Sequence, residues 1–145
     1  MTPSFTKRAP AGDTIPRAVC DSCGFVSYDN PKIVVGAVVT YGDKLLLCRR
    51  AIQPSRGLWT VPAGYLEHGE TPEEGAAREA HEEATAQLTI IGLLAVYAIR
   101  RIGQVQLIYR AALDRPFFAP GPESEAVRLF PKDAVPWDEL AFPSV

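Results

Sequence analysis

The sequence predicts an α/β fold in which a mixed β-sheet lies between helical layers, an α/β/α sandwich. Two observations support this prediction: apolar, β-branched runs precede and follow one strongly helical segment, and more helix is expected near the C-terminus. The 145 residues, 47% of them hydrophobic, suffice for one core of ordinary size. We expect an N-terminal arm over residues 1–31 and the sandwich over residues 32–145.

The first 31 residues are rich in Pro, Gly, Asp and Ser and show no sustained periodicity, so we expect an extended arm. Its one local feature is a turn with two cysteines, CDSCG. The N-terminus lacks the apolar segment of a signal peptide, and no uncharged apolar run reaches the roughly 20 residues that span a bilayer. We therefore expect a cytoplasmic protein without a membrane partner.

The strands before the helix begin with a hairpin. KIVVGAVVTY is continuous and β-branched, and Gly42-Asp43 turns the chain into KLLLCRR. GLWTVP reads as another short strand that ends at Pro62.

The helix is expected from about Pro72 to Ala84. Thr71 suits the N-cap, Pro72 suits the first helical position, and Glu74 stands three residues after the cap. The residues that follow are mostly Ala, Glu and Arg, which favour helix.

After the helix, two strands flank a turn, and the second of them carries alternating polar residues, Gln104 and Gln106. A proline-broken loop, a last strand and a short helix follow. In order, these elements are expected over residues 88–99, 104–113, 114–125, 126–130 and 131–142.

The formal net charge of −2 indicates neither a polyanion binder nor an acidic tail. Its distribution is uneven, because seven acidic residues and one Arg lie from Glu67 to Glu83. The basic residues elsewhere are dispersed rather than continuous, so we expect no nucleic-acid partner.

Three of these acids, Glu79, Glu82 and Glu83, share one face of the predicted helix, because residues three and four apart are neighbours. Like charges at these spacings weaken a helix by roughly a few tenths of a kcal/mol per pair. The arrangement therefore suits a divalent cation better than it suits stability. Oxygen-only ligands favour Mg²⁺ or Mn²⁺. The alternative is a solvated acidic face.

The spacing of the whole segment favours the metal site over that alternative. It reads Gly64, five residues, Glu70, seven residues, then REAHEE beginning at Arg78. This pattern resembles the Nudix hydrolase box, with Thr85 standing where that family usually has Gly.

The resemblance implies a loop-helix-loop that holds Mg²⁺ or Mn²⁺. Its ligands would be Glu79, Glu82, Glu83 and a backbone carbonyl near Gly64. Glu70 would form an ion pair with Arg78 and brace the loop against the helix. Such a cation can bridge phosphate oxygens, so the implied reaction is hydrolysis of a diphosphate linkage.

A general base must lie within hydrogen-bond reach of the attacking water. One of the box glutamates could serve, but so could a carboxylate of the later loop, PGPESEA. In that loop we choose Glu123 over Glu125; the alternative is that both are exposed loop acids.

The resemblance extends beyond the box to CDSCGFVSYDNPK, RAIQPSRGLWTVPAGYLEHGE and FFAPGPESEAVRLF. Together they look like the Nudix group that carries an N-terminal zinc ribbon and includes ADP-ribose and FAD pyrophosphatases. The implied substrates are ADP-ribose and FAD, then NADH, each cleaved to AMP and a phosphorylated product. The resemblance also implies a homodimer.

Zinc is where the chain departs from that group. A structural zinc site uses four ligands, usually two CxxC knuckles, and Cys20 with Cys23 forms one. Where the other would stand, the chain reads MTPSFTKR. Zinc would therefore need ligands from a partner chain or from distant residues, and we expect the turn to be a structural remnant. Cys48, in a predicted strand, is expected to be a buried apolar residue.

Other side chains near the box are candidates for binding the nucleotide. Those that could stack on adenine or flavin are Tyr28, Tyr65 and Trp59, although core packing explains Trp59 better. Those that could contact phosphates, or else form a solvated hairpin end, are Arg49, Arg50 and Arg56. The two histidines, which we expect on the surface, are His68 and His81.

Two other functions compete. One is a house-cleaning hydrolase of nucleoside triphosphates, which would share the box. The other is a non-catalytic binding module, either a nucleotide-sensing regulator or a CxxC-bearing nucleic-acid binder. Regulators of this kind tend to lose box carboxylates, and none is lost here.

Overall fold

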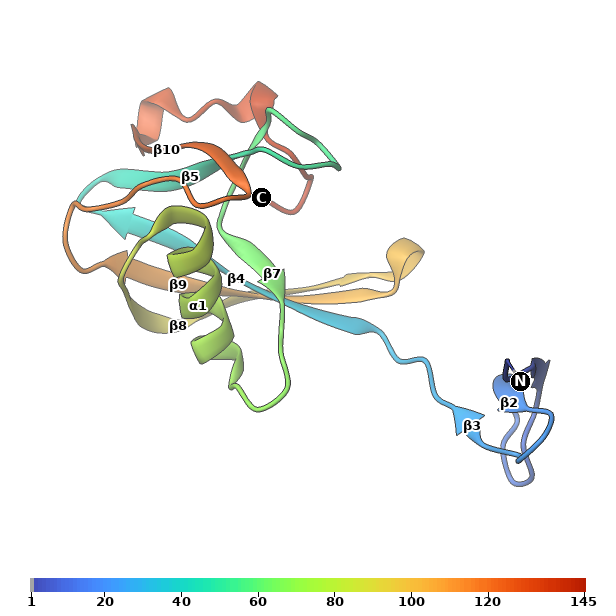
Figure 1. Cartoon of the computed structure of the whole chain (residues 1–145). Helices are drawn as coiled ribbons and strands as arrows, with labels where there is room; N and C mark the ends of the chain where they lie inside the picture. Colours follow the sequence, from blue (N-terminus) through green and yellow to red (C-terminus); the bar gives the residue numbers. More distant parts are fainter. Residues whose placement is uncertain (1) are drawn as a thin grey trace. The chain divides into compact units, whose positions relative to one another are not determined.

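A computed structural model describes residues 2–145 (Figure 1). Their contacts divide the chain into two compact units, an N-terminal unit up to Pro31 and a C-terminal unit from Lys32 to Val145. Within the described residues, no helix is both long enough and apolar enough to cross a membrane.

The N-terminal unit is a small antiparallel sheet rather than the extended arm that we expected. Its strands, in spatial order, are β1 (Phe5–Arg8), β2 (Arg17–Cys20) and β3 (Val26–Ser27). The turn between β1 and β2 is stabilised by Asp13, whose carboxylate accepts from the Ile15 amide and from Arg17 Nε, both at 3.0 Å. Strands this short carry no detectable period in the sequence, which is why the prediction was wrong.

The C-terminal unit is built on a mixed sheet with the order β10-β5-β4-β9-β8, to which β6 adds beside β5 and β7 beside β4. The β4 and β9 strands run parallel, and the other pairs are antiparallel. The strands are β4 (Lys32–Tyr41), β5 (Lys44–Arg50), β6 (Trp59–Thr60), β7 (Ala63–Tyr65), β8 (Leu88–Ile99), β9 (Gln104–Leu113) and β10 (Ser124–Pro131). The predicted mixed sheet is confirmed, and the strands expected for KIVVGAVVTY, KLLLCRR, 88–99 and 104–113 are β4, β5, β8 and β9.

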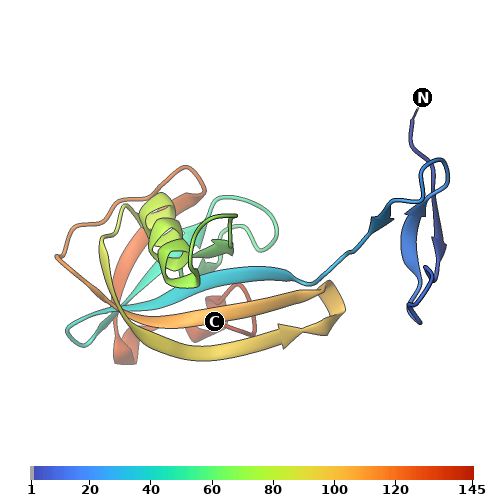
Figure 2. The same ribbon diagram turned by 90° about the horizontal axis from the view of Figure 1, so that it is seen from below.

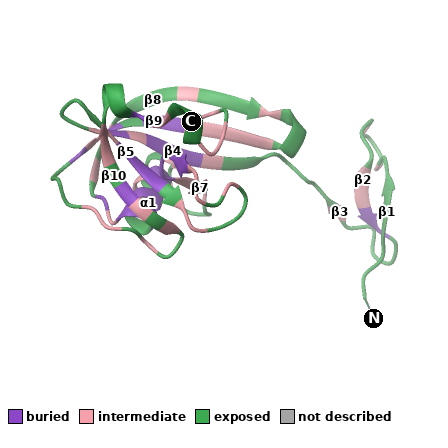
Figure 3. Cartoon of the chain, turned by 90° about the horizontal axis from the view of Figure 1, so that it is seen from above, coloured by how far each residue is buried: buried purple, intermediate pink, exposed green. Residues whose placement is uncertain are grey.

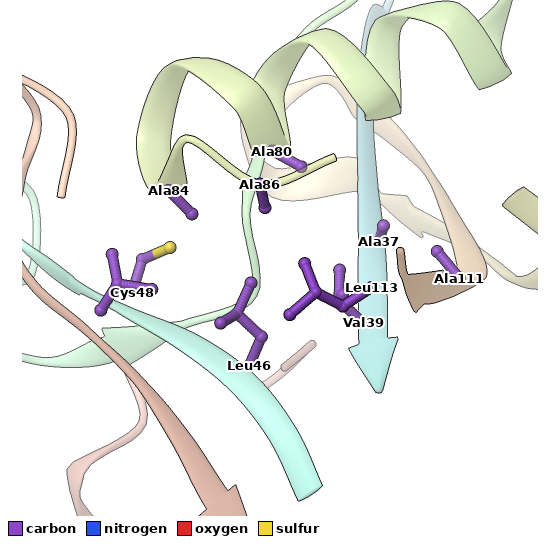
Figure 4. Packing of buried hydrophobic residues seen from close by; sticks show 10 residues of the cluster. Ala37, Val39, Leu46, Cys48, Ala80, Ala84, Ala86, Ala111 and Leu113 are labelled. Carbon is purple, nitrogen blue, oxygen red and sulfur yellow. The ribbon is translucent and has the colours of Figure 1, made fainter. Parts of the chain in front are cut away.

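One face of this sheet is covered by α1 (Pro72–Ala84), which lies across the strands (Figure 2). Small side chains allow the close approach: Ala80 and Ala84 pack against Ala37 of β4 and against Leu46 and Cys48 of β5 (Figure 4). Buried residues concentrate where α1 meets the sheet, whereas β8 is exposed along most of its length (Figure 3).

The other face is covered by the C-terminal segment, where Val135 and Leu140 pack on Leu47 and Trp59. The short helix predicted over residues 131–142 is wrong. Two 3-10 turns, η2 (Lys132–Ala134) and η3 (Trp137–Glu139), stand in its place, and a third, η1 (Arg100–Ile102), joins β8 to β9. Pro136, inside the predicted range, lacks the amide that a continuous helix needs there.

Candidate active site

The loop between β7 and α1 is tied to the helix by the Arg78 guanidinium. Its Nε and Nη2 donate to the two carboxylate oxygens of Glu70 at 2.9 and 2.8 Å, and Nη2 also donates to the Tyr65 carbonyl at 3.0 Å. Hydrogen bonds from Arg78 and from the Glu67 amide lower the pKa of Glu70 from 4.5 to about 2. The structure thus contains the ion pair that the resemblance implies.

The ion pair between Glu70 and Arg78 should make the free energy of unfolding depend on pH in the acid range. Because the pKa of Glu70 is lowered in the folded protein, its stabilising contribution is complete above 4.5 and is lost as the pH falls toward 2. We expect Glu70→Gln to unfold at lower urea concentration than the parent at neutral pH, with the difference shrinking toward acid pH. Urea titrations at several pH values measure this. Glu67→Gln in the same loop is the control, and an equal loss in both variants would contradict the role given to Glu70.

Glu79 lies on the face of α1 that contacts β7. Its side chain is 12% exposed, and its Oε1 accepts from Arg78 Nη1 at 2.7 Å. A Cβ at Gly64 would collide with the Glu79 carboxylate, so glycine is what lets β7 pass this close. Burial raises the pKa of Glu79, and the neighbouring guanidinium offsets part of this rise. The structure therefore brings Gly64 and Glu79 together.

The other two carboxylates of the helix face differ in exposure. Glu83 is buried, and its Oε2 accepts from the Ala63 amide of β7 at 3.1 Å. Burial raises the pKa of Glu83 to about 7, and the nearby charge of Glu79 adds to the rise. The Glu82 side chain is 57% exposed, and its Oε2 accepts from Arg78 Nη1 at 3.2 Å.

The loop after β9 is fastened to the C-terminal end of α1. The Ala119 amide donates to the Ala84 carbonyl at 2.8 Å, and the Gly121 amide donates to the Glu83 carbonyl at 3.0 Å. Thr85 takes the left-handed conformation, φ 53°, that glycine usually supplies, and its hydroxyl donates to the Ala119 carbonyl at 3.1 Å. This hydrogen bond accompanies a left-handed helix end without a glycine.

The same loop brings Glu123 within electrostatic reach of two of the helix carboxylates. The Ala51 amide donates to the Glu123 carbonyl at 2.9 Å and so fixes this part of the loop. The negative charge of Glu123 contributes to the raised pKa of both Glu79 and Glu83, which places the three groups within electrostatic reach of one another. We call Glu79, Glu82, Glu83 and Glu123 the acidic cluster.

Glu125, the alternative base, is engaged elsewhere. Its carboxylate oxygens lie 3.5 Å from Arg49 Nε and 3.4 Å from Arg56 Nε. Two of the three arginines that could contact phosphates, Arg49 and Arg56, are therefore engaged by Glu125. Arg50 instead lies close enough to Glu83 for its charge to lower the pKa of that carboxyl.

The acidic cluster fits a hard divalent cation by the chemistry of its donors. They are all carboxylate oxygens, and Arg78 offsets only part of their charge. Across residues 2–145, no three Cys, His, Asp or Glu side chains lie close enough to form a ready metal site. The bonds described above account for this, since Glu79 and Glu82 turn toward Arg78 whereas Glu83 turns toward Ala63.

A cavity of about 650 Å³ opens on β7, lined there by Ala63, Gly64 and Tyr65. Arg50 also lines it, with its guanidinium 5.2 Å from the Phe142 ring centre. Further lining side chains that we did not single out as binding residues are Tyr97, Arg101, Gln104 and Gln106. The signal in the sequence for Gln104 and Gln106 was the polar alternation in β9, which by itself indicates no more than a strand.

Several other predictions can be placed. Trp59 is buried, with its ring 4.9 Å from that of Phe130, so core packing explains it. His68 and His81 are exposed, as expected. Cys48 is buried, and burial raises its pKa to about 12. Tyr28 belongs to the N-terminal unit, where the guanidinium of Arg17 lies 5.3 Å from its ring centre.

The two cysteines of the N-terminal unit lie at the turn between β2 and β3. The Cys20 sulfur is 3.2 Å from the Ser22 hydroxyl, and this hydrogen bond is the main cause that lowers the Cys20 pKa to about 7. Ser4, which precedes β1, donates its hydroxyl to the Asp21 carboxylate at 2.7 Å. That Cys20 and Cys23 form a structural remnant rather than a zinc site stays a prediction.

Known proteins resemble this chain over nearly its whole length. The family model described as NUDIX domain matches residues 30–144, and the model described as Nudix N-terminal matches residues 3–29. A MutT-like protein of Streptomyces ambofaciens is 37% identical over 102 residues, which is 70% of this chain and 64% of that protein. An ADP-ribose pyrophosphatase of Methanocaldococcus jannaschii is 35% identical over 71 residues, which is 49% of this chain and 42% of that protein.

The chain thus spans less than two thirds of the length of these curated relatives. Among solved structures, a Nudix hydrolase from Nitrosomonas europaea superposes with a TM-score of 0.94 at 46% identity, covering 98% of this chain and 81% of that one. This match confirms the predicted α/β/α sandwich class. The chain belongs to the Nudix hydrolase family.

Proposed function

We propose that this Nudix hydrolase cleaves the pyrophosphate bond of a nucleoside diphosphate joined to a second moiety. The substrates would be ADP-ribose or FAD, then NADH, and the products AMP and a phosphorylated partner. The observation that supports this choice is the cavity of about 650 Å³ beside the acidic cluster, a size typical of pockets that enclose a whole ligand. The match to the Methanocaldococcus jannaschii ADP-ribose pyrophosphatase supports the same class.

The residues that would hold Mg²⁺ or Mn²⁺ are Glu79, Glu82, Glu83 and the Gly64 carbonyl. When bound, the cation would reduce the electrostatic repulsion between the diphosphate and these carboxylates and would lower the pKa of the attacking water. Glu70 would position Arg78, whose guanidinium orients two of the cluster carboxylates.

Glu123 would act as the general base. It would take a proton from the attacking water as the new oxygen-phosphorus bond forms and the bridging oxygen-phosphorus bond breaks. Arg50, between Glu83 and the cavity, would meet the phosphate charge.

A substrate panel tests this proposal. We expect turnover of ADP-ribose and FAD with Mg²⁺ or Mn²⁺, release of AMP on chromatography, and no turnover in EDTA. A clear preference for an oxidised purine triphosphate would replace the proposal with a house-cleaning function. Absence of turnover for the whole panel, with nucleotide binding retained, would favour a regulator. The homodimer remains a prediction that light scattering can test.

A further inference from the structure

The cavity on β7 adjoins the acidic cluster through two residues that they share. The Ala63 amide donates to Glu83 while Ala63 lines the cavity, and Gly64 packs against Glu79 while it lines the cavity. Successive residues of a strand face opposite sides, so Tyr65 extends toward the cavity where Gly64 faces Glu79. A nucleotide with its diphosphate at the acidic cluster would therefore place another part of itself in the cavity.

The side chains that line the cavity indicate which part of the nucleotide would bind there. Among the described residues, the lining includes no Asp or Glu, while Arg50 and Arg101 supply positive charge. Tyr65 and Tyr97 supply aromatic surface. A planar group attached to an anion fits this combination, because rings stack on tyrosine and the arginines balance the charge.

Two glutamine amides stand on the same wall. Gln104 and Gln106 are two residues apart on β9, so their side chains share one face, and Gln106 lies opposite Tyr97 of β8. Gln106 Nε2 donates to Gln104 Oε1 at 3.5 Å, and Gln104 Nε2 donates to the Tyr65 hydroxyl at 3.4 Å. These bonds are long, and each amide has further donor and acceptor capacity to offer a ligand.

We propose that Gln104 and Gln106 recognise the adenine edge of the substrate, with the ring held between Tyr65 and Tyr97. An amide presents a donor beside an acceptor, and adenine presents the complementary pair at N6 and N7. Adenine is shared by ADP-ribose and FAD, so one recognition element serves both. This inference rests on the proposed function and adds to it the residues that select the base.

Binding and turnover together test the inference. Gln106→Leu keeps the approximate size of the side chain and removes both hydrogen-bonding groups. We expect it to raise the Kd for AMP, measured by calorimetry without metal, about tenfold. The KM for ADP-ribose and FAD should rise similarly, while a guanine analogue, GDP-ribose, should be little affected. Gln104→Leu should act in the same direction.

A matched control and a second variant keep the result interpretable. Gln87→Leu removes a glutamine that bonds to Arg115 outside this cavity, and it should bind AMP as the parent does. Gln106→Glu should shift preference toward the guanine analogue, because a carboxylate accepts from the guanine N1 and N2 donors but offers none to adenine N7. Thermal unfolding confirms that each variant is folded.

The outcomes separate this inference from the proposed function. If the parent turns over ADP-ribose but both glutamine variants bind AMP as tightly as it does, the inference fails and the function stands. If Gln106→Leu impairs FAD alone, the wall holds the flavin ring and the adenine assignment is wrong. If the parent hydrolyses none of ADP-ribose, FAD and NADH, the proposed function fails, while AMP binding still decides the role of the glutamines.

Discussion

Glu83→Gln should lower kcat on the order of 10³-fold and at the same time stabilise the metal-free protein at neutral pH. The loss of activity follows because electrostatic stabilisation of the transferring phosphoryl group, which this carboxylate would help to organise, is worth several kcal/mol. The gain in stability follows from burial. The pKa of Glu83 is raised from 4.5 to about 7, so the folded protein resists ionising a group that ionises readily when unfolded.

The sign of the pH dependence follows from proton counting. Between pH 4.5 and about 7 the folded state retains a proton on Glu83 that the unfolded state has released, so the free energy of unfolding falls as the pH rises. The fall amounts to roughly 3 kcal/mol at most. Glu83→Gln lacks this dependence, so it should match the parent near pH 4.5 and exceed its stability at pH 8.

Urea titrations in EDTA and steady-state kinetics in Mg²⁺ measure the two effects. Mg²⁺ should raise the melting temperature of the parent and leave that of Glu83→Gln nearly unchanged, since a ligand stabilises only the state that binds it. Glu73→Gln, an exposed acid in the first turn of the same helix, is the control. Parent-like turnover by Glu83→Gln would remove this residue from the site.

Glu123→Gln should lower kcat by about 10² to 10⁴-fold, the usual contribution of a general base. The amide keeps the shape of the side chain but cannot take a proton from water. Metal-induced stabilisation should survive, because Glu79, Glu82 and Glu83 remain. This retention distinguishes Glu123→Gln from Glu83→Gln.

Glu125→Gln provides the matched control two residues along the loop. Its carboxylate faces Arg49 and Arg56 rather than the acidic cluster, and those contacts are exposed and weak, so kcat should stay near that of the parent. If Glu125→Gln were instead the more damaging change, the two loop acids would have to exchange roles. A pH profile of kcat completes the test, because loss of the base should remove its acid limb.

Predictions from the sequence succeeded where neighbouring residues decide the structure. The start of α1 is set by Thr71 and Glu74, which form the reciprocal hydrogen bonds of a capping box in the structure. The strands β4 and β8 could be predicted because their residues form nearly continuous apolar runs. The pairing of Glu70 with Arg78 could be expected because the box spacing resembles a known family.

The predictions from the sequence failed where contacts between residues far apart in the chain determine the structure. Gln104 and Gln106 line the cavity only because β8 and β4 flank β9 and residues 142–145 line the same cavity. The sheet of the N-terminal unit depends on the pairing of Phe5 with Cys20 across a turn, and no local period signals it. The short C-terminal helix was wrongly predicted because Pro136 lies inside its expected range, and the chain forms two separate 3-10 turns there.

The Gly121 amide donates to the Glu83 carbonyl in the last turn of α1, so the loop that carries Glu123 is hydrogen-bonded to the helix that carries Glu79, Glu82 and Glu83. The proposed base and the proposed metal ligands should therefore move together. Gly121 has no room for a side chain, since a Cβ would meet the Glu82 carbonyl. Fraying at Thr85 or bulk at Gly121 would displace both sets of groups together. Double-mutant cycles between Gly121→Ala and Glu123→Gln should therefore show strong non-additivity, even though neither backbone amide of that loop takes part in the reaction.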